Sequence, residues 1–269
     1  MTDDSDTKDE LLYEVRGSTG WVTLNRPEAR NALTFGMYRR LAELCAGLPA
    51  PGEAPDAVRV LVIAGAGGRA FAAGTDMRQF RAFETPRDAL DYEHKIDEVL
   101  GAVEACRVPT VAALAGACTG GGAGIAAAGA LRLATADLKF GFPIARTLGN
   151  TLSIASLARL SALAGAGRVK EMIFTARLLG AEEALAAGLV SEILPDQVAL
   201  MARAEALAEQ LAGYAPITLR TTKEALRRLR VEGATAKDED LIVEAYMSAD
   251  FKEGIEAFLG KRKPQWKGR

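Results

Sequence analysis

The chain has 269 residues, of which 49% are apolar, so one large domain with a sizeable buried core is expected. Its 33 Lys+Arg against 35 Asp+Glu give a formal net charge of −2, which provides no basis for a nucleic-acid partner. A single histidine argues against a multi-histidine metal site, and three scattered cysteines predict reduced thiols in a cytoplasmic protein. No cofactor is predicted.

Two segments bear on targeting and membranes. Residues 1–10 hold five acidic side chains and almost nothing apolar, which predicts a disordered leader and no signal peptide. Residues 108–131 lack any charge over about the length of a membrane span, but Gly and Ala dominate them. A strand followed by a buried helix fits this composition better, so no membrane contact is expected.

Hydrophobic patterning predicts strands and helices that alternate first, with helices dominating last. In chain order it predicts strands at 11–15 and 21–24 forming a hairpin, a helix at 35–48, a buried strand at 58–64, a helix at 87–106, a buried strand at 109–114, an Ala-rich helix to about 128 and a strand at 131–134. Helices follow at 153–163, 167–174, 181–186, 197–211, 217–229, 237–248 and 251–259, with a strand at 189–194. This order indicates an α/β core over 11–195 and a helical C-terminal region over 196–269.

Two glycine-rich turns follow buried strands, in VLVIAGAGGRAFAAGTD at 60–76 and in TVAALAGACTGGGAG at 110–124. Unpaired backbone N–H groups in such turns can bind an anion or stabilise a carbonyl oxygen that becomes negative. Alternatively, the glycines only allow close packing of helix on strand. The match of Gly122-x-Gly124-x-x-Ala127 to a dinucleotide fingerprint is weak, because it lies mid-chain and Asp137 follows too soon.

Five segments add a more specific pattern. They are WVTLNRPEARNAL at 21–33, RAFAAGTD at 69–76, VPTVAALAGACTGGG at 108–122, AEEALAAGLV at 181–190 and EGIEAFLGKRKPQW at 253–266. Together and in this order they resemble the crotonase (enoyl-CoA hydratase/isomerase) superfamily. The second is similar to that family's A-F-x-A-G-x-D turn, and the third to its block ending in three glycines.

The resemblance implies an α/β fold, a spiral of ββα units with a helical C-terminal trimerisation region, and a homotrimer or a dimer of trimers. It implies acyl-CoA thioesters as substrates, with two backbone N–H groups holding the thioester oxygen as it gains enolate character. Carried over by position, these donors are Thr75 and Gly121, the middle glycine of the triplet. Losing one such donor typically costs roughly 10²–10³ in rate.

The resemblance also implies contacts with coenzyme A from two ends of the chain. The residues concerned are Glu28, Ala29 and Arg30 in the first loop, Ala72 and Ala73 before the first donor, and Phe258 and Lys261 near the C-terminus. Arg30 is expected beside a phosphate or the adenine. For Arg30 and Lys261, ordinary solvated charge is the alternative interpretation.

The sequence departs from the family at two catalytic positions. The hydratases place one glutamate two residues after the glycine triplet and a second after the proline of the next conserved segment. Here those positions are Gly124 and Ile144, and neither side chain can transfer a proton. Because general acid–base catalysis typically contributes about 10²–10⁴-fold, hydration by the usual two-glutamate route is doubtful.

A few polar side chains remain as candidates for proton transfer or substrate contact. Asp76 follows the first donor and either acts in catalysis or caps a helix beginning near residue 77. His94, the only imidazole, lies on the helix between the two donor segments, where some relatives place a catalytic histidine. The candidates for contact with the acyl group are Thr119, Ile144, Arg146, Asn150 and Thr151, with Thr151 also expected to cap the next helix.

Two classes of function follow. The first is an acyl-CoA enzyme of the hydratase/isomerase type, with thioester hydrolysis or decarboxylation as other reactions of the same site. The second is a non-catalytic acyl-CoA binder that kept the fold and lost the chemistry. Both predict acyl-CoA binding, and turnover separates them.

Overall fold

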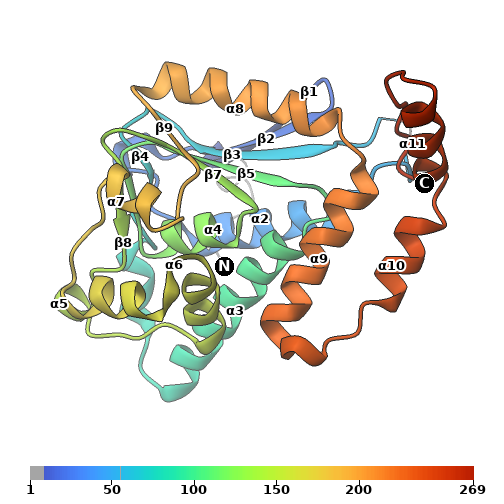
Figure 1. The fold of residues 1–269 in the computed structure, drawn as a ribbon. Coiled ribbons are helices and arrows are strands. Elements are labelled where there is room, and N and C mark those ends of the chain that lie inside the picture. The colour runs from blue at the N-terminus through green and yellow to red at the C-terminus, as the bar shows by residue number, and fades with distance from the viewer. Residues whose placement is uncertain (1–8, 55) are drawn as a thin grey trace.

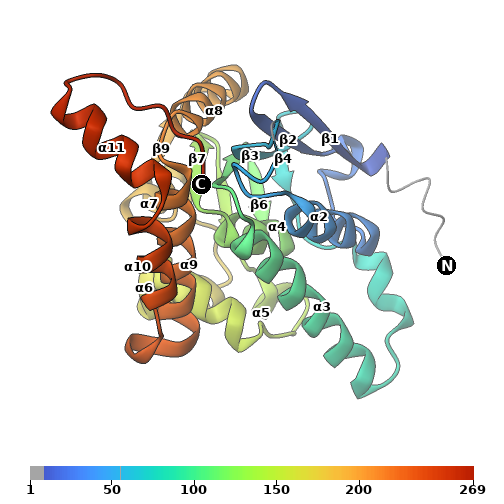
Figure 2. The same ribbon diagram turned by 90° about the vertical axis from the view of Figure 1, so that its right-hand side faces the viewer.

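The computed structural model describes residues 9–54 and 56–269 (Figures 1 and 2). The larger sheet has the strand order β1-β2-β3-β5-β7-β9. Its strands are β1 (Leu11–Arg16), β2 (Thr19–Leu24), β3 (Val60–Gly65), β5 (Thr110–Leu114), β7 (Leu131–Thr135) and β9 (Glu192–Leu194). The first two pair antiparallel as the predicted hairpin, and the remaining neighbours pair parallel. All residues of β3 and β5 are buried, as their apolar runs predict for strands covered on both faces.

A second, smaller parallel sheet is the main feature that the sequence did not predict. Its strands are β4 (Ala70–Ala72), β6 (Ala117–Thr119) and β8 (Lys139–Gly141). Each follows a strand of the larger sheet after a short turn. The large-sheet strand, the small-sheet strand and the helix after them repeat as the ββα units that the resemblance implied.

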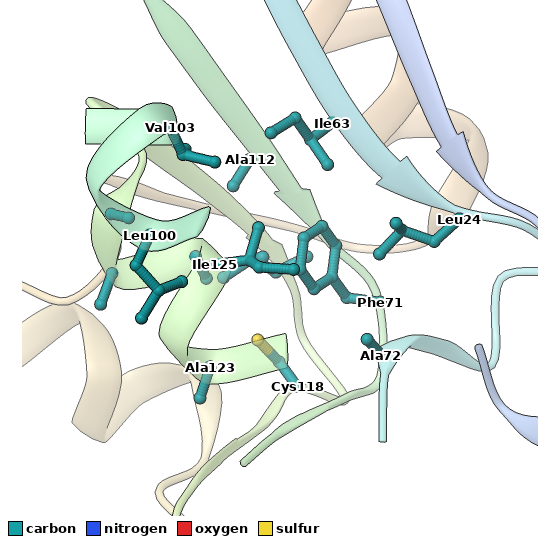
Figure 3. Packing of buried hydrophobic residues seen from close by; sticks show 14 of the residues in the cluster. Leu24, Ile63, Phe71, Ala72, Leu100, Val103, Ala112, Cys118, Ala123 and Ile125 are labelled. Carbon is teal, nitrogen blue, oxygen red and sulfur yellow. The ribbon is translucent and has the colours of Figure 1, made fainter. Parts of the chain in front are cut away.

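Helices cover both faces of the larger sheet (Figure 1). On one face, α8 (Gln197–Ala212) buries Leu200, Ala204 and Ala208 against the sheet. The other face is covered by α2 (Phe35–Gly47), α3 (Pro86–Ala105) and α4 (Gly121–Ala128). Figure 3 shows Phe71 of β4 in the centre of this core, with Ile63 and Ile125 among the neighbouring side chains.

Apart from the short α5 (Ile144–Thr147), which was not predicted, the later helices are close to those predicted. They are α6 (Ile154–Phe174), α7 (Ala181–Ala186), α9 (Pro216–Glu232), α10 (Glu239–Tyr246) and α11 (Ala249–Leu259). The predicted helices at 153–163 and 167–174 form a single element with a kink at Gly165, whose φ is 74°. Figures 1 and 2 both place α9, α10 and α11 together at one side of the molecule.

The short 3-10 turns are η1 (Pro27–Ala29), η2 (Met77–Ala82) and η3 (Gly233–Thr235). Residues 1–8 of the predicted leader lie outside the described residues. Glu10, by contrast, pairs with Arg26 at 3.0 Å and accepts a hydrogen bond from the Thr34 hydroxyl, so it belongs to the folded body. Within residues 9–54 and 56–269, no helix combines the length and the apolar character needed to cross a bilayer.

Candidate active site

A cavity of about 290 Å³ lies where the two glycine-rich turns meet α3 and the start of α6. Its lining is largely apolar, with a few polar groups, which is typical of small-molecule sites. The lining residues are Ala73, Gly74, Thr75, Met77, Phe80, Tyr92, Glu93, Ile96, Leu100, Thr119, Gly120, Gly121, Gly124, Phe142, Pro143, Ile144, Thr147, Leu148, Asn150, Leu152 and Ser156. Both predicted backbone donors, Thr75 and Gly121, are therefore in one cavity.

A short parallel β-bridge joins the first turn to Leu33. The Leu33 N–H donates to the Gly74 carbonyl at 2.8 Å, and the Asp76 N–H donates to the Leu33 carbonyl at 2.9 Å. In a parallel bridge of this kind, the N–H of the intervening residue points to the opposite side. The N–H of Thr75 therefore faces away from Leu33, and within the described residues it has no hydrogen-bond acceptor.

Glycines allow the second turn to approach the first closely. Gly74 and Gly120 have φ values of 112° and 52°, which L side chains rarely adopt. A Cβ on Gly120 would lie 3.5 Å from the Gly74 Cα, so the two turns are in contact. Gly121 begins α4, and the N–H of a first helical residue has no acceptor inside its helix. The two turns thus bring two unpaired N–H groups to the same cavity.

Three hydroxyl groups form a hydrogen-bonded cluster around the side chain of Thr75, the first donor. The Thr75 Oγ1 lies 2.9 Å from the Tyr38 hydroxyl and 3.1 Å from the Tyr92 hydroxyl. Burial raises the pKa of both tyrosines, so they stay neutral and hydrogen-bond as hydroxyls. A Cβ on Gly121 would lie only 1.8 Å from the Tyr38 hydroxyl, so this position accepts glycine alone while Tyr38 is in place.

The carboxylate of Asp76 has a structural role. Its carboxylate caps η2 by accepting the Arg78 N–H, and it pairs with the Arg78 side chain at 2.6 Å and with Arg26 at 3.2 Å. These hydrogen bonds, chiefly those from Arg78, hold its pKa well below the usual range. Asp76 is not among the residues that line the cavity. Of the two roles that the sequence left open, the geometry supports the cap.

The helix between the turns contributes a residue that the sequence analysis missed. His94 is exposed on α3 and does not line the cavity, whereas its neighbour Glu93 does. Glu93 precedes Ile96 and Leu100, two buried residues of the same helix face, by three and seven positions. This spacing was the available signal, since it places Glu93 and not His94 on the inner face.

The remaining candidates for acyl contact fall into two groups. Thr119, Ile144 and Asn150 line the cavity, as does Gly124, the position where the resemblance implied the first hydratase glutamate. Arg146 and Thr151 are exposed and are absent from the lining. The prediction that Thr151 caps the next helix is wrong, because the hydroxyl of Ser153 accepts the Ser156 N–H at the start of α6.

The residues expected to contact coenzyme A are more dispersed. Glu28 and Ala29 lie in η1, and the carbonyl of Arg30 accepts the Ala73 N–H at 3.0 Å, which places this loop beside the first turn. Ala72 is buried in β4 directly before that turn. Phe258 is 84% exposed and lines a different cavity of about 560 Å³ between α9, α10 and α11. Lys261 follows α11 and lines neither cavity.

An α/β fold of ββα units with two backbone donors in a largely apolar cavity is the architecture of acyl-CoA enzymes in the crotonase superfamily. Comparisons with known proteins agree. The family model for enoyl-CoA hydratase/isomerase matches residues 14–269. The chain belongs to the enoyl-CoA hydratase/isomerase family.

Individual relatives match over nearly their whole length. The chain is 30% identical to the short-chain-enoyl-CoA hydratase of Clostridium acetobutylicum, with 94% of this chain and 95% of that protein covered. It is 33% identical to the (E)-benzylidenesuccinyl-CoA hydratase of Thauera aromatica, with 96% and 99% covered. The crystal structure of an enoyl-CoA hydratase/carnithine racemase from Magnetospirillum magneticum superimposes with a TM-score of 0.87 at 31% identity, covering 97% of this chain and 96% of that one.

Proposed function

We propose that the cavity binds the acyl end of an acyl-CoA thioester and that the N–H groups of Thr75 and Gly121 hold its carbonyl oxygen. The observation that supports this most directly is the pair of unpaired N–H groups in two touching turns. Such donors stabilise the negative charge that develops on the oxygen when the thioester becomes an enolate. The positive end of the α4 dipole adds to this stabilisation at Gly121.

The reaction class is enolate chemistry of the hydratase/isomerase kind. The acyl chain extends from the two donors along a wall made mainly of apolar side chains, including Ile96, Leu100 and Ile144. Exclusion of water by such a wall strengthens the hydrogen bonds to the oxygen. The chain's own N–H groups therefore provide the electrostatic part of catalysis without a metal ion or a separate cofactor.

One observation favours a second candidate, a non-catalytic acyl-CoA binder. Gly124 and Ile144 line the cavity at the two positions where the hydratases carry glutamate, and neither can move a proton. A binder would retain affinity for acyl-CoA and show no turnover.

The deciding experiment is incubation of the purified protein with enoyl-, 3-hydroxyacyl-, malonyl-type and aroyl-CoA thioesters, followed by mass spectrometry. A new acyl-CoA product or free acid from any of them supports the enzyme. Binding by calorimetry without any product supports the binder. Absence of both binding and turnover contradicts the acyl-CoA function itself.

We also propose that the C-terminal helices form the interface of a homotrimer or a dimer of trimers. Exposed apolar side chains concentrate there, among them Met247, Phe258 and Leu259, which are 70%, 84% and 71% exposed. Apolar side chains gathered on one surface are typical of an interface between protein chains. Light scattering should give three or six times the 28.4 kDa of one chain, and a monomer mass would contradict the proposal.

A further inference from the structure

The cavity contains a carboxyl group that the family pattern does not assign. Among the described residues that line it, Glu93 is the only carboxylic acid, and Tyr92 is the only other group that titrates. The two positions where the hydratases place glutamate, Gly124 and Ile144, lie in the same lining. Glu93 thus approaches the same space from α3 instead of from α4 or the β8–α5 segment.

The carboxylate of Glu93 is held in place by the start of α6. The backbone N–H of Ser153 donates a hydrogen bond to it, and the Ser153 hydroxyl donates to the Asp97 Oδ1 at 2.7 Å. Asp97 follows Glu93 by one helical turn, so the two carboxylates share a face of α3. Ser153, the N-cap residue of α6, therefore interacts with both carboxylates, and a restricted position is what a proton-transfer group requires.

The surroundings of Glu93 make its carboxyl group more basic than usual. Burial, followed by the charge of Asp97, raises its pKa, and the hydrogen bond from Ser153 opposes the rise. Besides Asp97, the titratable groups that its charge influences are the neutral phenols of Tyr92 and Tyr38, and Asp97 itself lies 3.8 Å from the guanidinium of Arg159 on α6. A glutamate in free peptides has a pKa of about 4.3, and a higher value suits a base that works near neutral pH.

On the acyl-CoA function proposed above, we infer that Glu93 is the catalytic residue that removes a proton from the carbon beside the thioester carbonyl and returns it. The C–H bond breaks and an O–H bond to Glu93 forms. The electron pair of the C–H bond becomes the C=C bond of the enolate, and the negative charge moves to the oxygen held by Thr75 and Gly121. No oxidant, reductant or metal ion enters this balance.

The same group then determines the product. If the proton returns to the same carbon, the net result is exchange of that hydrogen with solvent. If the acyl chain has a double bond between C3 and C4, the enolate extends over it and the proton can return to C4. One carboxylate suffices for this shift of the double bond, so the inferred substrate class is 3-enoyl-CoA thioesters.

The test measures deuterium uptake and isomerisation in D₂O with butyryl-CoA and 3-butenoyl-CoA as probes, followed by mass spectrometry. Glu93→Gln should lower the rate by at least about 100-fold, the lower bound for a general base. Its KM should change by less than threefold, because the amide keeps the shape of the side chain. The matched control is Glu98→Gln, which changes an exposed glutamate of the same helix outside the cavity and should keep the full rate.

A second variant separates loss of chemistry from loss of structure. Glu93→Ala leaves space for a small acid, so 100 mM formate should restore part of the exchange rate to this variant and none to Glu93→Gln. In the wild type, the acid limb of the kcat profile should lie above the usual glutamate range. A purely structural role for Glu93 would produce neither formate rescue nor such a limb.

The outcomes for the two proposals are distinguishable. If the wild type exchanges neither probe, the role of Glu93 is overturned, and the acyl-CoA function fails as well if no thioester of the wider panel is bound or converted. If the wild type exchanges them and Glu93→Gln keeps more than a tenth of the rate, the role of Glu93 is overturned while the acyl-CoA function stands. If Glu93→Gln loses binding in proportion to rate, Glu93 is a binding group and the inference is likewise overturned.

Discussion

The cavity has two walls that are built differently. The wall made by the turns at 73–76 and 119–121 presents backbone N–H groups, fixed by glycines with positive φ and by the bridge to Leu33. The opposite wall, from α3 and the start of α6, presents side chains, among them Glu93. A backbone wall tolerates substitution of its side chains as long as the turn persists, whereas a side-chain wall changes chemistry with a single replacement.

This difference bears on the two proposals. The N–H of Thr75 requires no particular side chain, and Gly121 requires only the absence of one beside Tyr38. The proposed donors therefore do not depend on which side chains stand at Gly124 and Ile144. The carboxylate of Glu93 lines the same cavity from α3, so under the proposal the proton-transfer group belongs to a different element from that of the hydratases.

The strongest test of the backbone wall removes one donor. Gly121→Pro deletes the N–H, and proline is tolerated at the first position of a helix. Because the Tyr38 hydroxyl would clash with any Cβ there, the variant is made together with Tyr38→Phe. We expect the kcat of acyl-CoA turnover to fall by roughly 10²–10³-fold.

The matched control for this pair is Gly121→Ala with Tyr38→Phe, which adds a Cβ of the same kind and keeps the N–H. It should stay within about tenfold of the wild type, since the terminal ring carbon at position 38 must still move by a few tenths of an ångström to clear the 3.1 Å contact. Equal rates for the proline and alanine variants, both folded by circular dichroism, would contradict the assignment of Gly121 as a donor.

A substitution at Asp76 tests whether the backbone wall depends on the ion pairs that this residue makes with Arg26 and Arg78. Asp76→Asn keeps a cap on η2 but weakens the pairing of buried Arg26, so unfolding in urea should show a loss of roughly 1–3 kcal/mol. The folded-state pKa of Asp76 is depressed, so its contribution is present above the unfolded pKa of about 3.9 and is lost as pH falls through the folded value.

The difference in stability between the wild type and Asp76→Asn should therefore be constant above about pH 5 and shrink as the pH falls below about 4. The kcat at pH 7 should stay within about tenfold, because Asp76 is outside the cavity lining. A loss of kcat near that of Glu93→Gln, with unfolding unchanged, would restore Asp76 as a proton-transfer candidate.

The hydroxyl of Thr75 provides a smaller test of the same wall. Thr75→Val keeps the N–H and the shape of the side chain but leaves the Tyr38 and Tyr92 hydroxyls without this partner. Stability should fall by about 1 kcal/mol or more, and Thr75→Ser, which retains the hydroxyl, should fall less. Urea unfolding measures the first effect, and a kcat that stays within about tenfold in both variants would agree with a donor that is backbone alone.

The two walls also differ in how far the sequence predicts them. The buried apolar runs of β3 and β5 were predicted as strands, but the glycine turns after them allowed either unpaired N–H groups or close packing alone, and the family resemblance was needed to assign Thr75 and Gly121 as donors. The strands β4, β6 and β8 escaped prediction, since three residues are too few to establish a period of two. These strands hold the turns in contact, and that contact is a property of the folded chain alone.

The side-chain wall was predicted less well for a different reason. His94 drew attention because imidazole titrates near neutral pH, a property of the isolated residue. Glu93 resembles many surface glutamates until α3 packs against the cavity and buries part of it. The inward face of α3 is set by the spacing to Ile96 and Leu100, so position on a helix outweighs residue type in locating the acid.

A substitution at Asp97 should produce the smallest change in the side-chain wall, a shift in the pKa of Glu93. Asp97→Asn removes the like charge that raises the pKa of Glu93, while the amide oxygen can still accept the Ser153 hydroxyl. The lost charge also leaves Arg159 without one partner, but its closer ion pair with Glu104 at 2.9 Å remains. A base must be ionised to act, so the acid limb of the kcat profile should move to lower pH.

On the alkaline plateau of the profile, where Glu93 is ionised in both proteins, the rates of the wild type and Asp97→Asn should be equal. Glu98→Gln, which changes an exposed charge one residue further along α3, should leave the limb in place. A limb that does not move in Asp97→Asn, or that moves to higher pH, would show that the titrating group in the profile is not Glu93. The direction of this small shift therefore identifies the acid more specifically than the size of any loss in rate.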